Sequence, residues 1–259
     1  MILTLDVGNS QIFCGAFDGA ELKATFRRTS SILASSDEFG TFFRTMLREN
    51  GVDPSQIEVA AICSTAPGPV HSLRNCFRKY FQFEPFLLQP GVKTGLKIRY
   101  RNPLEVGADK IANAVGALER FPGRNLLIVD FGTATTLCAV TKDKQYLGGI
   151  ITPGLHTSVT ALDTQTARLP SVEIVQPPAV LGRTAVESIQ SGLYFGTLGM
   201  MRSLAAAVTK EHFPTEPPLV VGTGGFGRLF EKEDLFDEFV PELPLLGLLR
   251  AYHLTKSDT

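Results

Sequence analysis

Two stretches of the chain share one pattern of apolar and polar positions. A mainly apolar run of four residues leads into Asp-x-Gly at Asp6 and again at Asp130, an offset of 124 residues. A second apolar run follows each copy, and Cys14 matches Cys138 at the same offset. Short apolar runs separated by a glycine turn are typical of β-strands. The pattern therefore predicts a strand, a tight turn and a second strand, used twice.

The rest of the first half predicts a third strand and then alternating helices and strands. Ser35 and Glu38 form a capping box that opens a helix, and Asn50-Gly51 ends it. In order, the expected elements are a strand at Glu21 to Thr29, a helix with the apolar face Phe39, Phe42, Phe43, Met46 and Leu47, a buried strand at Ile57 to Cys63, and a helix lined by Val70, Leu73 and Phe77.

The second half repeats this order. The expected elements are strands near 126–131, 135–141 and 145–151, a long helix near 184–209, a short strand at Leu219 to Val221 and a closing helix from Leu245. Two halves of one plan predict two α/β domains, at 1–116 and 117–259, that face each other. The cleft between such domains is the favoured place for a ligand.

Composition and charge argue against several classes of protein. The 259 residues are 44% apolar and 20% charged, so a large core is expected and disorder is not. Lysine plus arginine (25) nearly cancels aspartate plus glutamate (26), which gives a formal charge of -1. This balance provides no broad positive field for nucleic acid or for an anionic membrane. We expect neither as a partner.

The N-terminal residues and the cysteines favour the cytoplasm. The chain starts without a basic segment, and Asp6 interrupts its first apolar run, which argues against a signal peptide. The four cysteines show no Cys-x-x-Cys spacing, and we interpret Cys14, Cys63, Cys76 and Cys138 as reduced packing residues. The four histidines are scattered without a metal spacing, so we expect surface or packing roles for them.

One apolar stretch has about the length of a membrane span. Ile189 to Val208 contains a single charge, Arg202. Polar residues interrupt the stretch, and Gly192, Gly196 and Gly199 would let another helix approach closely. We interpret it as a core helix or a dimer helix.

The two Asp-x-Gly turns suggest phosphate binding. Glycine lets backbone N–H groups approach phosphate oxygens, and a carboxylate such as Asp6 or Asp130 can hold a hydrated Mg²⁺. One such turn alone would be read as a plain Asx turn. The duplication, with Asn9-Ser10 and Thr133 following, favours a pair of phosphate loops. Such a pair resembles the superfamily of acetate and sugar kinases, heat-shock ATPases and actin, which implies two duplicated RNase H-like domains with the active site in the interdomain cleft.

Other nucleotide-binding patterns are absent or weak. No Gly-x-x-x-x-Gly-Lys-Ser/Thr sequence occurs, so a P-loop is not expected. Gly222 to Gly227 matches the dinucleotide pattern, but it lies too near the C-terminus for the rest of such a domain. In the superfamily just named it fits an adenosine-binding loop, and the alternative is a plain strand-to-helix turn.

The segment Gly107-Ala-Asp-Lys110 opens a helix whose Ile111, Val115 and Leu118 are expected to face inward. The helix dipole keeps Asp109 ionised and makes it a weak base. Phosphoryl transfer tolerates a weak base, because its loose transition state depends more on position than on basicity. The alternative is that Asp109 only caps the helix.

Taken together, the motifs resemble the type III pantothenate kinases in order and spacing over essentially the whole chain. They are Asp6-Val-Gly-Asn-Ser10, Tyr100, Gly107-Ala-Asp-Lys110, Asp130-Phe-Gly-Thr133, Gly148-Gly149, Pro153-Gly154, Thr166-Ala-Arg-Leu-Pro170 and Gly182-Arg183.

The resemblance implies a cytoplasmic homodimer that phosphorylates pantothenate with ATP and Mg²⁺, the first step of coenzyme A synthesis. It implies that Asp109 is the base, and that Asp130 helps to hold a monovalent cation, K⁺ or NH4⁺. The first phosphate loop would comprise Asp6, Val7, Gly8, Asn9, Ser10, Gln11, Ile12 and Phe13, with Thr133 contacting ATP from the second, while Tyr100, Gly107, Ala108, Asp109 and Lys110 would surround pantothenate.

Two positions depart from the family pattern. Lys110 stands where the family usually has arginine, which exchanges a planar two-pronged donor for a point charge. Thr184-Ala185 stands where the usual pair is Asn-Thr, whose threonine reaches substrate from the neighbouring subunit. We keep Thr184 as a candidate substrate contact.

Two rival functions remain open on the sequence. One is a non-catalytic relative that affects transcription, and the other is a different kinase or phosphatase of the superfamily. Retention of Asp6, Asp130 and Asp109 favours catalysis over regulation. Only Gly107 to Lys110 and the family match select pantothenate over a sugar.

Overall fold

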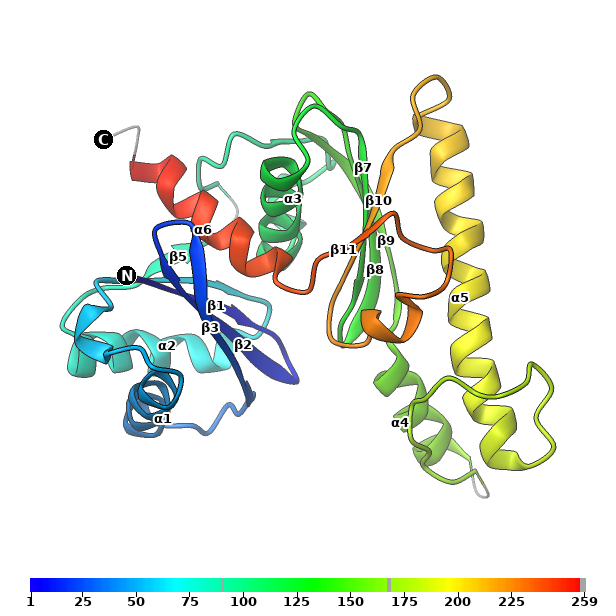
Figure 1. Ribbon diagram of the computed structural model, residues 1–259, viewed down its shortest axis with the longest axis horizontal. Helices are drawn as coiled ribbons and strands as arrows, with labels where there is room; N and C mark the ends of the chain where they lie inside the picture. The colour runs from blue at the N-terminus through cyan, green and yellow to red at the C-terminus, as the bar shows by residue number, and fades with distance from the viewer. Residues whose placement is uncertain (90, 167–168, 257–259) are drawn as a thin grey trace. The chain divides into compact units, whose positions relative to one another are not determined.

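The structure of the protein, a computed structural model, describes residues 1–89, 91–166 and 169–256 (Figure 1). Strands and helices alternate along the chain, so the fold is α/β, as expected. The contacts divide the chain into two compact units. The first contains Met1–Arg120 together with the residues from Glu242 onward, and the second contains Phe121–Pro241.

The first unit is built on a sheet of five strands in the order β3-β2-β1-β4-β5. Strands β1, β2 and β3 form an antiparallel meander, and β4 and β5 continue the sheet parallel to β1. Apolar residues alternate with others along β1, which sends alternate side chains to opposite faces. The strands are β1 (Ile2–Val7), β2 (Gln11–Asp18), β3 (Glu21–Thr29), β4 (Val59–Ser64) and β5 (Phe86–Leu88).

Helices cover both faces of this first sheet (Figure 1). On one face, α1 (Ser36–Glu49) and α2 (Pro67–Cys76) supply Phe39, Phe43 and Leu73 to a core that also contains alternate β1 residues. On the other, α6 (Leu243–Lys256) places Leu245 and Leu249 against β2.

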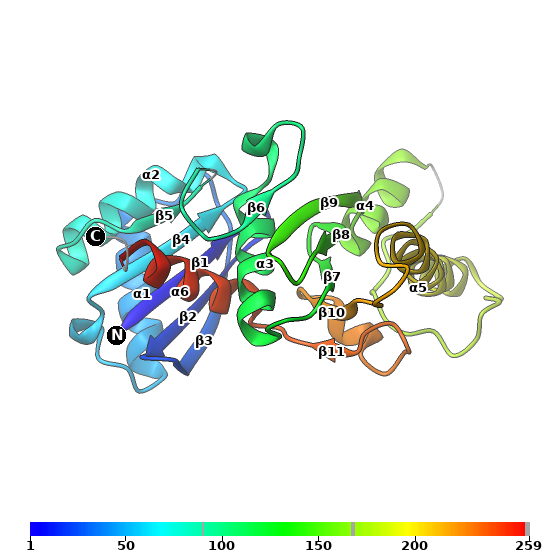
Figure 2. The same ribbon diagram turned by 90° about the horizontal axis from the view of Figure 1, so that it is seen from above.

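Helix α3 (Ala108–Arg120) lies against α6, and Figure 2 shows the pair from above. A Cβ atom added at Gly247 would lie 1.8 Å from the backbone oxygen of Ala112, so the two helix backbones are in direct contact. The remaining short elements of this unit are β6 (Lys97–Ile98) and helical turns at Pro54–Gln56, Phe77–Phe81 and Pro103–Glu105.

The second unit repeats the meander. Its strands β7 (Leu126–Phe131), β8 (Ala134–Val140) and β9 (Gln145–Pro153) are antiparallel, and β10 (Leu219–Thr223) and β11 (Glu238–Phe239) run parallel to β7. The order across these strands is β11-β10-β7-β8-β9. Helix α5 (Ala185–His212) packs on this sheet, while α4 (Leu155–Gln165) follows β9 and a helical turn at Gly227–Phe230 follows β10 (Figure 1).

The internal repeat is confirmed as structure, with one correction in its register. Val7 pairs with Ile12 in the first hairpin, whereas Phe131 pairs with Thr135 in the second, so the second turn is one residue shorter. A change of one residue moves each following side chain to the opposite face. The match of Cys14 with Cys138 at a constant offset is therefore wrong as a structural equivalence.

Most other elements lie where the sequence predicts them. The capping box at Ser35 is present, with both of its hydrogen bonds. The helix α4 and the strand β5 were not predicted. The closing helix α6 packs with the first unit, whereas a domain boundary between residues 116 and 117 would place it in the second. The assignment of each unit to an RNase H-like domain stays a prediction.

The cysteines and the apolar helix also agree with the sequence. All four cysteines are buried and carry no disulfide. No helix within the described ranges combines the length and the apolar character that a membrane span requires.

Candidate active site

The first Asp-x-Gly turn is a compact loop with three exposed side chains at its tip. The N–H group of Gly8 donates to the backbone oxygen of Gln11 at 3.0 Å, and the hydroxyl of Ser30 donates to the oxygen of Gly8 at 2.5 Å. Asn9, Ser10 and Gln11 are exposed. These three side chains therefore form the solvent-facing tip of the turn.

Three other members of the expected phosphate loop face the protein interior. Val7, Ile12 and Phe13 are buried, and the guanidinium of Arg27 lies over the Phe13 ring, 3.6 Å from its centre. The side chains of these three residues hold the hairpin in place. Within the loop, the exposed side chains are those of residues 9–11, and a contact from Val7, Ile12 or Phe13 to a nucleotide stays a prediction.

Asp6 lies at the end of β1, opposite Cys63 on the parallel strand β4. The Cys63 thiol donates to the Oδ1 atom of Asp6 at 3.3 Å. Burial raises the pKa of the Cys63 thiol well above its ordinary value, and the negative charges of Asp6 and Asp109 raise it further. The thiol therefore stays protonated and lies in the field of both carboxylates.

The start of α3 holds the two carboxylate oxygens of Asp109 in different settings. The backbone oxygen of Gly107 accepts from the N–H groups of Lys110 at 3.1 Å and Ile111 at 3.2 Å. The Oδ2 atom of Asp109 pairs with the Lys110 ammonium at 3.3 Å. Its Oδ1 atom is buried and has no hydrogen-bond partner within the described part of the chain. One carboxylate oxygen is therefore held by Lys110 and the other is left for a further partner.

Gly107 makes room for this carboxylate. A Cβ atom at Gly107 would lie 2.3 Å from Oδ1 of Asp109, closer than any side chain could be accommodated without movement. The glycine in the motif is thus explained by the close approach of its backbone to Asp109. The buried faces of Ile111 and Val115 fix the helix as expected, while Leu118 is only partly buried.

In the second unit, the Asp130 turn and the glycine-rich turn after β10 lie side by side. Thr223 pairs with Asp130 across the two strands. Gly224 has φ +90°, and a Cβ atom there would lie 2.5 Å from Oδ1 of Asp130. The N–H group of Phe226 donates to the oxygen of Phe131 at 3.2 Å. This contact agrees with an adenosine loop placed beside the second phosphate loop.

Thr133 lies at the exposed tip of the second turn. Its backbone oxygen accepts from the N–H group of Gly154 at 3.1 Å and from the hydroxyl of Thr157 at 2.7 Å. The Pro153-Gly154 motif therefore supports this turn from the start of α4. A Cβ atom at Gly154 would lie 2.4 Å from the oxygen of Gly132, which explains why a glycine occupies that position.

The remaining expected contacts have varied settings. Tyr100 is partly buried in the loop after β6. Thr184 is the N-cap of α5, where its hydroxyl oxygen accepts from the N–H group of Glu187 at 3.1 Å. Ala167 and Arg168, in the Thr166 to Pro170 motif, lie outside the described residues.

Asp6 and Asp130 each place a carboxylate beside a glycine turn of their own unit. The described residues contain no cluster of three or more His, Cys, Asp or Glu side chains that could hold a metal alone. Mg²⁺ in nucleotide sites is usually held by one or two carboxylates together with phosphate oxygens and water. Asp6 in the first unit and Asp130 in the second are each a carboxylate donor of this kind.

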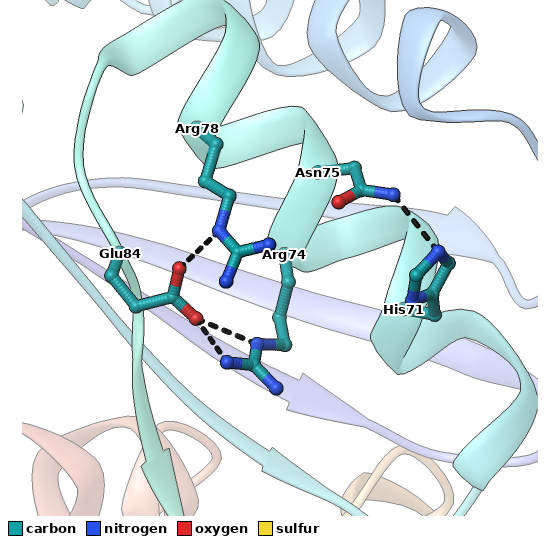
Figure 3. Close-up of polar contacts among 5 residues, drawn as sticks. All are labelled: His71, Arg74, Asn75, Arg78 and Glu84. Atoms are coloured by element: carbon teal, nitrogen blue, oxygen red, sulfur yellow. Dashed lines mark hydrogen bonds and ion pairs between the residues drawn. The ribbon is translucent and has the colours of Figure 1, made fainter.

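A group of polar contacts on α2 and in the residues just after it is separate from these features. Arg74 and Arg78 both donate to the carboxylate of Glu84, and the Asn75 amide contacts the His71 ring at 3.0 Å (Figure 3). All four histidines of the chain are exposed. The histidines therefore lie at the surface, which is one of the two settings expected for them.

Sequence reasoning missed Cys63 and Ser30 as parts of the first turn. Cys63 was read as packing alone, although it ends a strand predicted to be buried, where a parallel neighbour of β1 would place it beside Asp6. No pattern in the sequence identifies Ser30, because its contact with Gly8 depends on the pairing of β2 with β3.

The chain is similar to known kinases in sequence and in structure. The family model for type III pantothenate kinase matches residues 2–207. The type III pantothenate kinase of Legionella pneumophila (strain Corby) is 52% identical over 251 residues, which cover 97% of this chain and 98% of that protein. The type III pantothenate kinase of Elusimicrobium minutum (strain Pei191) is 46% identical over 257 residues, which cover 99% of this chain and 100% of that protein.

Among solved structures, the ROK hexokinase of Thermus thermophilus matches with a TM-score of 0.52 and 14% identity, over 100% of this chain and 99% of that chain. This likeness shows the fold of the actin-like ATPases and sugar kinases. The family match and the two full-length relatives agree with the order of motifs along the chain. The chain therefore belongs to the type III pantothenate kinase family.

Proposed function

We propose that the protein transfers the γ-phosphoryl group of ATP to the primary hydroxyl of pantothenate, with Asp109 as the general base. Family membership supports the substrate. The observation that carries the role of Asp109 is its carboxylate, whose Oδ1 atom is buried and without a partner in the described ranges while Lys110 holds Oδ2. An unpaired buried oxygen is costly unless a ligand completes it.

The two oxygens of Asp109 have separate tasks in this proposal. Lys110 pairs with Oδ2 and fixes the plane of the carboxylate. Oδ1 accepts the hydroxyl proton of the substrate as the hydroxyl oxygen attacks phosphorus. Because the transition state is loose, Asp109 both aligns the hydroxyl and accepts its proton, and its position matters more than its basicity.

The substrate and nucleotide contacts follow the family motifs. Tyr100 and the Gly107–Lys110 segment bind pantothenate, and the tip residues Asn9, Ser10 and Gln11 bind phosphate with Thr133 from the second turn. Thr184 stays a candidate contact, because its cap bond uses the hydroxyl as an acceptor and leaves its O–H group to donate.

The metal ions complete the charge balance of the site. Asp6 and Asp130 are the residues that would hold Mg²⁺, and Asp130 would also support K⁺ or NH4⁺. When bound, these cations neutralise negative charge on the transferring phosphoryl group. We further propose that the enzyme acts in the cytoplasm as a homodimer through α5, whose Gly192, Gly196 and Gly199 are exposed.

A blocked substrate separates binding from transfer. Pantothenate methylated on its primary hydroxyl should still compete with pantothenate for binding, and it should give no phosphorylated product by mass spectrometry. Phosphorylation of the methyl ether, or formation of an acyl phosphate from pantothenate, would overturn the proposed acceptor and the role of Asp109.

A further inference from the structure

The buried thiol of Cys63 is part of the first phosphate turn. Asp6 and Cys63 are direct neighbours on the parallel strands β1 and β4, so their side chains leave the same face of the sheet. The distance from Sγ to Oδ1 of Asp6 is 3.3 Å, and Cys63 is completely buried. The contact therefore joins the centre of the sheet to the first phosphate turn.

A hydrogen bond at this place restricts the Asp6 carboxylate. The torsion that rotates a carboxylate about its last bond is broad, so a donor on a neighbouring strand narrows the range of orientations. Cys63 is such a donor, held by the paired backbones of β1 and β4. A thiol is also a weak donor, so it orients the carboxylate without neutralising its charge.

A second carboxylate, that of Asp109, also acts on Cys63. The charges of both Asp6 and Asp109 act on it. An ammonium or guanidinium group at this position would pair with either carboxylate and compete with a cation or with Lys110. A neutral donor leaves both charges available for the reaction.

We propose that Cys63 is a positioning residue, which holds the Asp6 carboxylate in the orientation that binds the magnesium form of the nucleotide. This inference rests on the proposed function, because it assigns Asp6 to the bound cation. Cys63 is completely buried and acts through its hydrogen bond to Asp6.

The matched control is another buried thiol of the same unit. Cys76 on α2 is also completely buried and packs within the apolar core. Cys63→Ala and Cys76→Ala remove the same atom from buried positions, but only the first removes a donor to Asp6. Cys63→Ser retains a donor, although its shorter side chain requires the carboxylate to move toward it.

Calorimetric titration with the magnesium form of a non-hydrolysable ATP analogue tests the inference without turnover. We expect Cys63→Ala to weaken binding by up to about tenfold, because a thiol is a weak donor and its hydrogen bond contributes no more than a typical one. Cys63→Ser should recover part of this loss, and Cys76→Ala should bind as the wild type does. Equal affinities for Cys63→Ala and Cys76→Ala would overturn the inference and leave the kinase activity untouched. A wild-type protein that binds no magnesium nucleotide would overturn the inference and the proposed function together.

Infrared spectroscopy tests the hydrogen bond directly. The difference between the spectra of the wild type and of Cys63→Ala isolates the S–H stretching band of Cys63. The corresponding difference for Cys76→Ala isolates the band of Cys76. We expect the Cys63 band at the lower frequency, because a hydrogen bond to a carboxylate weakens the S–H bond, and Asp6→Asn should shift it upward. Equal frequencies, or no shift with Asp6→Asn, would contradict the proposed contact.

Discussion

Replacing Asp109 by asparagine separates a catalytic carboxylate from a structural one. The substitution preserves the size of the side chain but removes its charge and its ability to accept a proton. Loss of a general base lowers the rate about a hundred- to ten-thousand-fold, which corresponds to about 2.7–5.4 kcal/mol of activation free energy. We expect a decrease in kcat within this range.

The expected change in the free energy of unfolding is much smaller. Asp109→Asn loses the ion pair between Asp109 and Lys110, which lie 3.3 Å apart. The Lys110 side chain is 18% exposed and the Asp109 side chain 22%. A partly exposed pair contributes up to about 1 kcal/mol. The substitution also removes a buried charged oxygen that has no partner within the described residues, which offsets part of that loss. We expect the melting temperature to change by at most about 4 °C.

A matched variant on the same helix controls for the loss of an ion pair. Glu119 on α3 pairs with Arg250 at 3.1 Å. Glu119→Gln should leave kcat unchanged, with a small decrease in melting temperature at most. The rate constant and the melting temperature should be measured on the same preparation of each variant. Near-normal turnover of Asp109→Asn together with a clearly lower melting temperature would refute the catalytic role and return Asp109 to a structural one.

Three further predictions follow from other parts of the chain. Gly196→Leu should fold, because nothing lies within 4 Å of its Cβ position, but sedimentation should show dissociation of the dimer; an unchanged dimer would exclude this face of α5. Gly224→Ala should weaken nucleotide binding, because its Cβ would lie 2.5 Å from Oδ1 of Asp130. Gly225→Ala, whose Cβ would have nothing within 4 Å, should bind the nucleotide as the wild type does. Equal nucleotide affinities of the two variants in calorimetric titrations would contradict this prediction. Arg78 and Arg74 lower the pKa of Glu84 below 4.5, so the stability that Glu84 contributes is present above that pH and is lost as the pH falls through the lowered value. The free energies of unfolding of the wild type and of Glu84→Gln, measured by denaturant titration, should therefore converge in acid. A difference that stays constant with pH would refute the assignment.

The local elements of the fold were accessible from the sequence because their signals are local. The capping box, the glycine that ends α1 and the apolar runs of the meanders each lie within a few neighbouring residues. Helix α4 was missed because it has only two buried residues, Leu155 and Val159, and hence little periodic signal. The short strand β5 is defined by pairing with β4, not by its own pattern.

The site shows the same division between local and long-range signals. The motif around Asp109 was readable, but the separate settings of its two oxygens depend on tertiary burial and on the position of Lys110. The contact between Cys63 and Asp6 joins residues 57 positions apart, so it follows only from the parallel pairing of β1 with β4. The one-residue difference between the two turns likewise required the register of the strands.

The most direct test of the proposed function is a coupled assay of ADP formation with three acceptors: pantothenate, pantetheine and a hexose. Each acceptor is measured with Mg²⁺, in potassium buffer and in sodium-only buffer. We predict that pantothenate in potassium buffer gives the highest turnover, with 4′-phosphopantothenate formed in equal amount to ADP, and that the hexose gives none. Turnover with the hexose but not with pantothenate would contradict the proposed function, and full turnover in sodium-only buffer would contradict the assignment of a potassium or ammonium ion to Asp130.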